Sequence, residues 1–236
     1  MKPSAAKSKQ AHLQERIMSD IAHPIEHHRD DEGTRLGFWL FLYTELFLFA
    51  AFFLVYAVYR SSHLEDFKLA AESLNTGIGM VNTIILLTSS LTMVLSLDAL
   101  KKGSVKLAKT LLLVTIALGM AFLVIKGFEW SAKFEHHLFL QTARGIAAGH
   151  GSPLLTPGEE MLPVGQVLFF GLYFIMTGTH ALHIIIGAIW MLIVFFWISK
   201  GSINQDNHGV LERCGLYWHL VDVIWIFLFP LYYLVA

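Results

Sequence analysis

Five long apolar runs, separated by polar stretches, are the main pattern along this chain. They cover residues 36–59, 78–97, 107–128, 164–198 and 215–236. A helix needs about 20 apolar residues to cross the hydrocarbon core of a bilayer, so each run is long enough to span it. The fourth run is longer still, and we expect its first turns to lie at the membrane interface or the helix to be strongly tilted. The pattern therefore predicts an all-α integral membrane bundle of five transmembrane helices.

Composition agrees with this prediction and removes several classes of protein. Charged residues make up 15% of the chain, whereas an ordinary soluble domain carries about a quarter. The mean hydropathy is +0.57. The formal net charge of −1 leaves no excess of basic residues for a nucleic-acid partner. The single cysteine, Cys214, excludes a disulfide framework, a CxxC redox pair and an all-cysteine metal centre.

The distribution of Lys and Arg predicts the orientation of the bundle. Residues 1–35 form a polar tail before the transmembrane domain, residues 36–236. The tail lacks the apolar stretch of a cleavable secretory signal, so we expect the first apolar run to direct insertion. With the tail inside, twelve basic residues fall on the cytoplasmic side and five on or near the outer side. This bias predicts a cytoplasmic N-terminus and an external C-terminus, with an irregular external loop over residues 129–163.

Glu45 is the clearest ionisable residue at membrane depth. It lies about nine residues into the first run, among phenylalanines and with no Lys or Arg nearby in sequence. Ionisable groups inside a membrane are functional candidates, and burial without a cation favours the protonated acid. Two interpretations stay open: a carboxyl that exchanges protons, or a neutral acid that is hydrogen bonded to a neighbouring helix.

Polar residues in the fourth and fifth runs form faces of their own. His180 and His183 share a polar stripe with Thr177, which should face the bundle interior. In the fifth run, His219 and Asp222 lie three residues apart. An aspartate one turn from a histidine can fix its tautomer or share a proton with it. These histidines are therefore expected to be structural or linked to protons.

A metal or haem site in this chain is not favoured. A haem with two histidine ligands needs them on different helices at similar depth. We expect His180 near mid-membrane but His219 near the cytoplasmic edge. The polar tail carries a further His-rich run, which could chelate a surface metal but is more simply a solvated segment. Its members are His23, Glu26, His27 and His28.

Small polar residues recur along the second run. Asn82, Ser89 and Ser96 follow at seven-residue intervals, with Thr83 and Ser90 beside them. Residues of this kind mediate close packing of membrane helices through interhelical hydrogen bonds. We expect this stripe to face a neighbouring helix.

Several segments together resemble subunit III of the haem-copper oxidases. They occur in the order of that family and reach from about Gly37 to the C-terminus. The segments are GFWLFLYTELFLFAAFF, NTIILLTSSLTM, the glutamate of KGFEW, TGTHALHIIIG and, most specifically, HGVLERCGLYWHLVDVIWIFLF. The long external loop and the polar tail have no clear counterpart in typical members.

The resemblance implies a fold and a function. Family members are helical bundles of seven or, in many bacteria, five helices, and this chain is similar to the five-helix form. They bind no redox metal and pack against the catalytic subunit I, which holds haem and copper, in one complex with subunit II. The resemblance implies a multi-pass protein of the bacterial inner membrane, with bound phospholipid and no catalytic residue. The complex reduces dioxygen to water with electrons from cytochrome c or quinol and translocates protons.

The resemblance also assigns residues by position. Glu45 matches a buried, carbodiimide-sensitive glutamate, and Glu129 matches the acid that closes the third span. The remaining matches, which lie in the family's motifs, are Asn82, His180, His183, His208, Glu212, Trp218, His219, Asp222 and Trp225.

Three alternatives remain. A subunit III-like partner of a nitric oxide reductase would share this fold. A haem-binding membrane cytochrome would use His180 or His183 with His219. A stand-alone proton-coupled transporter centred on Glu45 is disfavoured because the sequence has no internal repeat.

Overall fold

The computed structural model describes residues 31–135 and 163–234. The chain divides into two units, residues 1–40 and 41–236. In the first unit, the described residues are the opening turns of helix α2, Asp31–Ser62. The tail histidines predicted from sequence lie outside the described residues.

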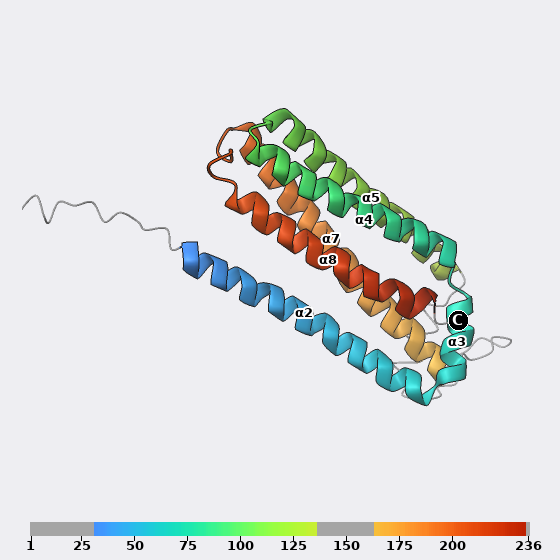
Figure 1. Ribbon diagram of the computed structural model, residues 1–236. Helices are drawn as coiled ribbons and strands as arrows, with labels where there is room; N and C mark the ends of the chain where they lie inside the picture. Colours follow the sequence, from blue (N-terminus) through green and yellow to red (C-terminus); the bar gives the residue numbers. More distant parts are fainter. Residues whose placement is uncertain (1–30, 136–162, 235–236) are drawn as a thin grey trace, which may run out of the picture. The chain divides into compact units, whose positions relative to one another are not determined.

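Helices make up every regular element in the described part of the second unit (Figure 1). After α2, these are α3 (Leu64–Glu72), α4 (Thr76–Lys101), α5 (Val105–Glu135), α7 (Val164–Ser199) and α8 (Gly209–Tyr233). Five of the helices, all but α3, are long and apolar enough to cross a membrane. The predicted all-α class and the five spans are confirmed, while the orientation of the termini stays a prediction.

The helices extend beyond the predicted runs. Helix α2 begins at Asp31 rather than at residue 36, and α5 continues to Glu135, into the predicted external loop. The short helix α3 was not predicted, because it is amphipathic instead of continuously apolar. It buries Phe67, Ala70 and Ala71 and exposes Glu65 and Glu72.

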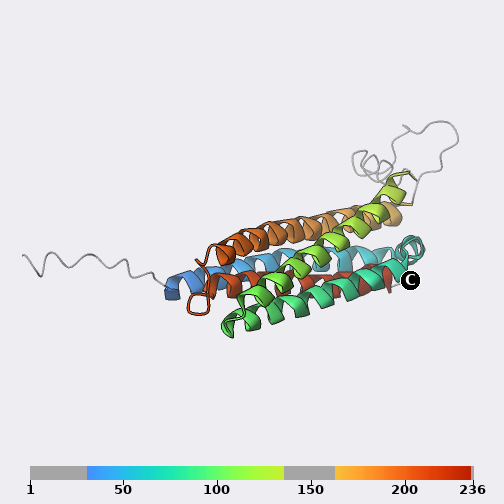
Figure 2. The same cartoon turned by 90° about the horizontal axis from the view of Figure 1, so that it is seen from above.

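Four of the helices, α4, α5, α7 and α8, form a closed bundle (Figure 2). Helix α4 packs against α5 and α8, and α7 packs against the same two helices. Helices α4 and α5 form one helical hairpin, and α7 and α8 form another. Each hairpin turns at a glycine with positive φ, Gly103 after α4 (φ 78°) and Gly201 after α7 (φ 77°). Glycine adopts this conformation without steric penalty, and it ends a helix in a tight turn.

The centre of the bundle is built around Trp218 of α8, which is fully buried. Its indole lies between Gly119 of α5 and Gly187 of α7, and a Cβ atom on either glycine would come within 3 Å of the ring. The indole Nε1 donates a hydrogen bond to Ser89 Oγ at 3.1 Å. Small residues thus let three helices close on one large side chain.

The polar stripe of α4 faces the bundle as predicted. Asn82, Ser89 and Ser96 are all fully buried. Ser96 Oγ donates to the carbonyl of Ala108 on α5 at 2.8 Å. Neither side-chain polar atom of Asn82 has a hydrogen-bond partner within the described part of the chain. Two further interhelical bonds join Trp225 Nε1 to Thr83 Oγ1 and Thr92 Oγ1 to Thr115 Oγ1.

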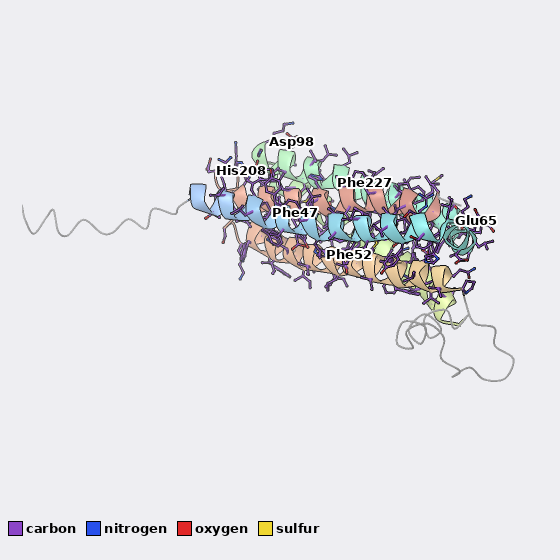
Figure 3. The ribbon with its side chains drawn as sticks, turned by 90° about the horizontal axis from the view of Figure 1, so that it is seen from below. Phe47, Phe52, Glu65, Asp98, His208 and Phe227 are labelled. Carbon is purple, nitrogen blue, oxygen red and sulfur yellow. The ribbon has the colours of Figure 1, made fainter. Side chains whose placement is uncertain are left out.

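Large apolar side chains cover the outside of the second unit. Phe47 of α2 and Phe227 of α8 are 72% and 60% exposed, and Figure 3 shows both between the polar ends. Glu65 lies at one end, which we call the α3 end, whereas Asp98 and His208 lie at the other, the His208 end. An apolar middle with polar ends suits a protein embedded in a bilayer.

Helix α2, from Phe41 onwards, meets the other helices through long side chains. Tyr56 Oη donates to the carbonyl of Leu231 at 2.7 Å, and the Tyr56 ring packs edge-on against Phe67 of α3. Phe53 contacts Phe227. These contacts hold α2 where its partly buried acid, Glu45, can reach α7.

Candidate functional site: buried polar groups inside the bundle

Lys126 and Glu129 form a buried ion pair on α5. The residues lie one helical turn apart, and Lys126 Nζ is 3.0 Å from Glu129 Oε2. The exposed fractions are 3% for Lys126 and 8% for Glu129. A buried ion pair is stable only when hydrogen bonds also satisfy the remaining donors and acceptors. The neighbouring helices supply those bonds.

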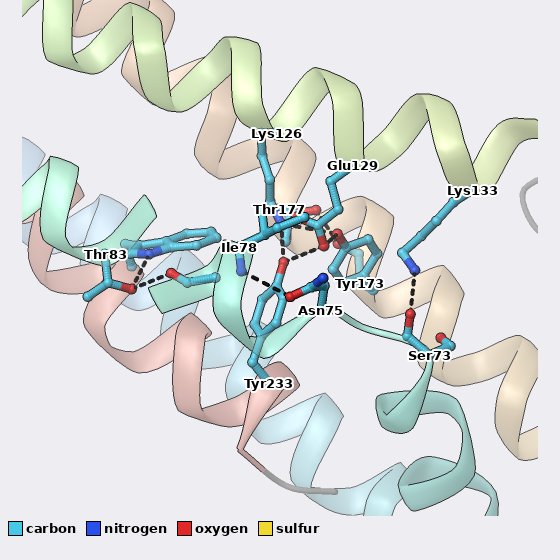
Figure 4. Close-up of polar contacts among 12 residues, drawn as sticks. Ser73, Asn75, Ile78, Thr83, Lys126, Glu129, Lys133, Tyr173, Thr177 and Tyr233 are labelled. Atoms are coloured by element: carbon cyan, nitrogen blue, oxygen red, sulfur yellow. Dashed lines mark hydrogen bonds and ion pairs between the residues drawn. The ribbon is translucent and has the colours of Figure 1, made fainter. Parts of the chain in front are cut away.

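Two tyrosines complete this pair into a closed network (Figure 4). Tyr173 of α7 and Tyr233 of α8 donate to Glu129 Oε1 at 2.8 and 2.6 Å. Lys126 Nζ in turn donates to both hydroxyl oxygens. The network therefore ties α5, α7 and α8 together near the α3 end.

An aromatic cage surrounds the ammonium group of Lys126. Its Nζ lies 5.0, 5.1 and 5.0 Å from the ring centroids of Tyr173, Trp225 and Tyr233. The faces of such rings attract a cation, most strongly where water is excluded. The cage and the Glu129 carboxylate together replace the water that the lysine loses.

Sequence reasoning missed this network and misplaced its acid. Lys126 was counted only as a basic residue near the outer end of the third span, and Glu129 was expected to close that span. In the structure, α5 continues past both to Glu135, and the segment apolar enough to span a membrane ends at Lys133. The available signal was the three-residue spacing of opposite charges in KGFE.

Glu45 and His183 form a second pair, partly buried, between α2 and α7, with side chains 18% and 11% exposed. Glu45 Oε2 is 2.8 Å from His183 Nε2, and His183 Nδ1 is 2.7 Å from the carbonyl of Thr179. Because a carbonyl only accepts, Nδ1 carries a proton and donates. A single further proton then lies between Nε2 and the Glu45 carboxyl.

The sequence indicated Glu45 and His183 as separate candidates, but it did not predict that they pair. Of the two open interpretations, the structure shows the hydrogen bond to a neighbouring helix. The exchange of a proton by this carboxyl stays a prediction. Phe49 packs edge-on against the His183 ring at 5.5 Å and shields the pair on one side.

His180 has a different environment, although it lies one turn from His183. It is fully buried, and its ring stacks on Trp225 with a centroid distance of 5.3 Å. The edge contact with Phe122 is at 5.7 Å. Neither ring nitrogen has a hydrogen-bond partner among the described residues. Two aromatic rings, from α5 and α8, thus flank the imidazole of His180.

The expected pairing of His219 with Asp222 is wrong. His219 Nδ1 is hydrogen bonded to Ser90 Oγ of α4 at 2.7 Å. Asp222 is 3% exposed, and its carboxylate oxygens make no hydrogen bond to His219. The imidazole therefore pairs with a residue of another helix. Residue spacing within α8 could not predict this partner, because it depends on how α8 packs against α4.

His208 and Glu212 lie at the His208 end, away from the Lys126–Glu129 and Glu45–His183 pairs. His208 is the residue before α8, and its Nδ1 is 2.8 Å from the carbonyl of Gln205. Glu212 Oε1 is 3.7 Å from Lys101 Nζ, and both side chains are about half exposed. Exposed pairs of this kind contribute little stability. Within residues 31–135 and 163–234, no group of three His, Cys, Asp or Glu residues could hold a metal ion.

Comparisons with known proteins place this bundle in a family. The profile of the family described as cytochrome c oxidase subunit III matches residues 16–136 and 160–236. Cytochrome bo(3) ubiquinol oxidase subunit 3 of Pseudomonas aeruginosa is 31% identical, covering 92% of each chain. Probable quinol oxidase subunit 3 of Staphylococcus saprophyticus is 30% identical over 93% of this chain and 98% of its own length.

A third relative carries the other electron donor in its name. Cytochrome c oxidase subunit 3 of Alkalihalophilus pseudofirmus is 29% identical over 91% of this chain and 93% of its own length. The match covers nearly the whole chain, including all five helices that are long and apolar enough to span a membrane. The chain belongs to the cytochrome c oxidase subunit III family, and its relatives are subunits of oxidase complexes.

Proposed function

We propose that this chain is the accessory, metal-free subunit III of a proton-translocating terminal oxidase in a bacterial inner membrane. The observation that carries the proposal is the family match, which includes all five spanning helices. Haem and copper belong to partner subunits in this proposal, and the complex reduces dioxygen to water. The relatives named above are oxidase subunits, which favours an oxidase over a nitric oxide reductase as the parent complex.

The proposed partners are subunit I, in direct contact, and subunit II in the same complex. Bound phospholipid is part of the proposal, because the side chains around the bundle are large, apolar and exposed. Such a surface needs either lipid chains or another membrane helix against it. The electron donor is cytochrome c or quinol, and the relatives include both kinds.

Purification from native membranes tests the assignment of the complex. We expect the chain, affinity-purified in mild detergent, to bring with it a large haem-bearing subunit and a copper-binding subunit, both identified by mass spectrometry. When this chain is stripped from the complex, the reduced-minus-oxidised haem spectrum should stay with the large subunit. A chain that purifies alone, or that carries the haem away, contradicts the proposal.

The role proposed for Glu45 and His183 is to hold a mobile proton and so to maintain proton uptake by the catalytic subunit. The hydrogen bond between Glu45 Oε2 and His183 Nε2 supports this role, because its proton can move to either atom. In Glu45→Gln, the side-chain amide can still donate to His183 Nε2, but the carboxyl that accepts a proton is lost. The substitution therefore separates packing from proton exchange.

We expect Glu45→Gln to assemble with normal haem content and to change the rate of inactivation during turnover. The measurement is the decay of oxygen consumption by the purified complex under continuous turnover. Glu65→Gln is the control, since Glu65 is exposed at the α3 end. An unchanged inactivation rate in Glu45→Gln would count against a role for this carboxyl.

A further inference from the structure

Tyr217 of α8 contacts the histidine of the Glu45–His183 pair in two ways. Its ring stacks on the His183 ring, with the two centroids 6.4 Å apart and the two planes 25° from parallel. Its Oη donates a hydrogen bond of 3.3 Å to the backbone carbonyl of the same residue. Tyr217 is only 2% exposed, so both contacts are made inside the protein.

The ring of Tyr217 is the part that can orient the imidazole. The hydroxyl bond is long for an O–H donor, which usually lies within about 3.0 Å of its acceptor. It also ends on the backbone of His183 and not on the imidazole. The stacked ring, in contrast, lies against the imidazole itself, and pairs of aromatic rings prefer defined relative orientations.

The surroundings of Tyr217 hold its ring against α7. Phe41 of α2 stacks on the same ring at a centroid distance of 6.0 Å, and Trp190 of α7 contacts it at 5.8 Å. Gly187, one turn after His183, lets the ring approach the helix, because a Cβ atom there would lie 3.2 Å from Tyr217 Cε1. The tyrosine is therefore fixed from two helices.

The imidazole of His183 needs such support to face its acid. Its Nδ1 is bonded to the carbonyl of Thr179 at 2.7 Å, which fixes one atom of the ring but allows the ring to pivot about that atom. Phe49 packs edge-on against it at 5.5 Å. Together with the stacked Tyr217, this contact restricts the pivot and keeps Nε2 2.8 Å from Glu45 Oε2.

Helix α2 carries the acid and two of the supporting rings on one face. Phe41 and Phe49 lie four residues before and after Glu45, and residues at this spacing are neighbours on a helix surface. Phe49 contacts His183 directly, whereas Phe41 contacts it only through Tyr217 in these stacked rings. The position of the acid and that of its partner are thus set by the same cluster of rings.

We propose that Tyr217 is a positioning residue for the Glu45–His183 pair, its ring holding the imidazole so that Nε2 meets the Glu45 carboxyl. The functional meaning of this inference rests on the proton-holding role proposed above for the pair. The orientation itself can be measured without that role. Because the ring performs this task, phenylalanine should replace Tyr217 and leucine should not.

The rate at which Glu45 reacts with dicyclohexylcarbodiimide tests the orientation. This reagent attacks protonated carboxyl groups in apolar surroundings, and an acid that loses its partner in such a site keeps its proton. The assembled complex is treated at neutral pH, and modified Glu45 is quantified by mass spectrometry. We expect Tyr217→Leu to be labelled about fivefold faster than the parent protein, the effect of losing one ordinary hydrogen bond. Tyr217→Phe should keep the parental rate.

Tyr232→Leu is the matched control, because it makes the same truncation on the same helix. Tyr232 is fully buried, donates to Met176 Sδ and packs against Phe169. It makes no hydrogen bond or ring contact with either member of the pair, and the labelling rate should equal that of the parent protein. Parental labelling in Tyr217→Leu, equal acceleration in Tyr232→Leu, or acceleration in Tyr217→Phe would each overturn the proposal.

Turnover separates a failure of this proposal from a failure of the proposed function. Tyr217→Leu should change the inactivation rate of the parent complex but add nothing in a Glu45→Gln background. If the pair has no part in proton uptake, neither substitution alters inactivation, while labelling still accelerates in Tyr217→Leu. If Glu45→Gln alters inactivation but Tyr217→Leu leaves labelling unchanged, the proton role stands and the positioning role is contradicted.

Phe41→Ala keeps the test decisive if Tyr217→Leu fails to accumulate. Phe41 is 41% exposed, so its truncation spares the core while removing a ring that supports Tyr217. Phe47→Ala on the same helix is its control, since Phe47 is 72% exposed on the outside of the protein (Figure 3). We expect faster labelling of Glu45 in Phe41→Ala than in Phe47→Ala, and equal rates would contradict the proposal.

Discussion

Replacing Glu129 by Ala is expected to lower the free energy of unfolding by about 3–5 kcal/mol, the usual consequence of removing one partner of a buried ion pair. The variant leaves Lys126 charged at 3% exposure with no carboxylate beside it. It also removes the acceptor of the Tyr173 and Tyr233 hydroxyls. Reversible unfolding in mixed detergent and SDS micelles measures the difference from the parent protein.

An exposed pair provides the matched control for this prediction. Lys102 Nζ and Asp98 Oδ2 are 2.7 Å apart, but their side chains are 71% and 50% exposed. Water solvates both charges, so Asp98→Ala should change the free energy of unfolding by about 1 kcal/mol or less. If Glu129→Ala were as mild as this control, the buried network would not be holding the three helices together.

The double variant Lys126→Met/Glu129→Ala separates a charge effect from a packing effect. Removing both charges leaves no unpaired ion, so the double variant should have a higher free energy of unfolding than Glu129→Ala alone. Recovery of most of the lost free energy would identify the unpaired ammonium as the cause. No recovery would assign the loss to the tyrosine hydroxyls and to the space left by the side chain.

The spans could be predicted from sequence because the bilayer imposes a simple requirement on helix length and polarity. Helix α3 could not, since its nine residues lie outside the apolar runs and bury only one face. The ends of α2 and α5 were also predicted short. In both helices the terminal turns are polar, and hydropathy alone marks where hydrocarbon ends but not where the helix ends.

The candidate site was predicted one residue at a time, but its pairings were not. Glu45 and His183 were both expected to be buried and polar, yet they are far apart in sequence and on different helices. His219 was assigned to Asp222 from spacing within one helix, whereas it meets Ser90 across the bundle. Spacing reports which residues share a face, and only the packing of helices decides which faces meet.

Trp218 is the residue whose truncation should weaken the bundle core most. It is fully buried between Gly119 and Gly187, and it donates a hydrogen bond to Ser89 Oγ. Trp218→Ala removes the indole from a site that glycine backbones cannot refill. We expect the free energy of unfolding to fall by about 3–5 kcal/mol, again measured in mixed micelles.

The glycines around Trp218 test whether close packing is the cause. In Gly119→Ala the new Cβ would lie 2.7 Å from Trp218 Cη2, whereas in Gly127→Ala, on the same helix, it would meet nothing within 4 Å. The first variant should lose about 1–3 kcal/mol through overpacking, and the second should be neutral or slightly stabilised. A smaller ring at position 218 should relieve the clash, so Gly119→Ala should be less harmful in Trp218→Phe than in the parent protein. Equal losses in both backgrounds would mean that the glycine is needed for a reason other than contact with the indole.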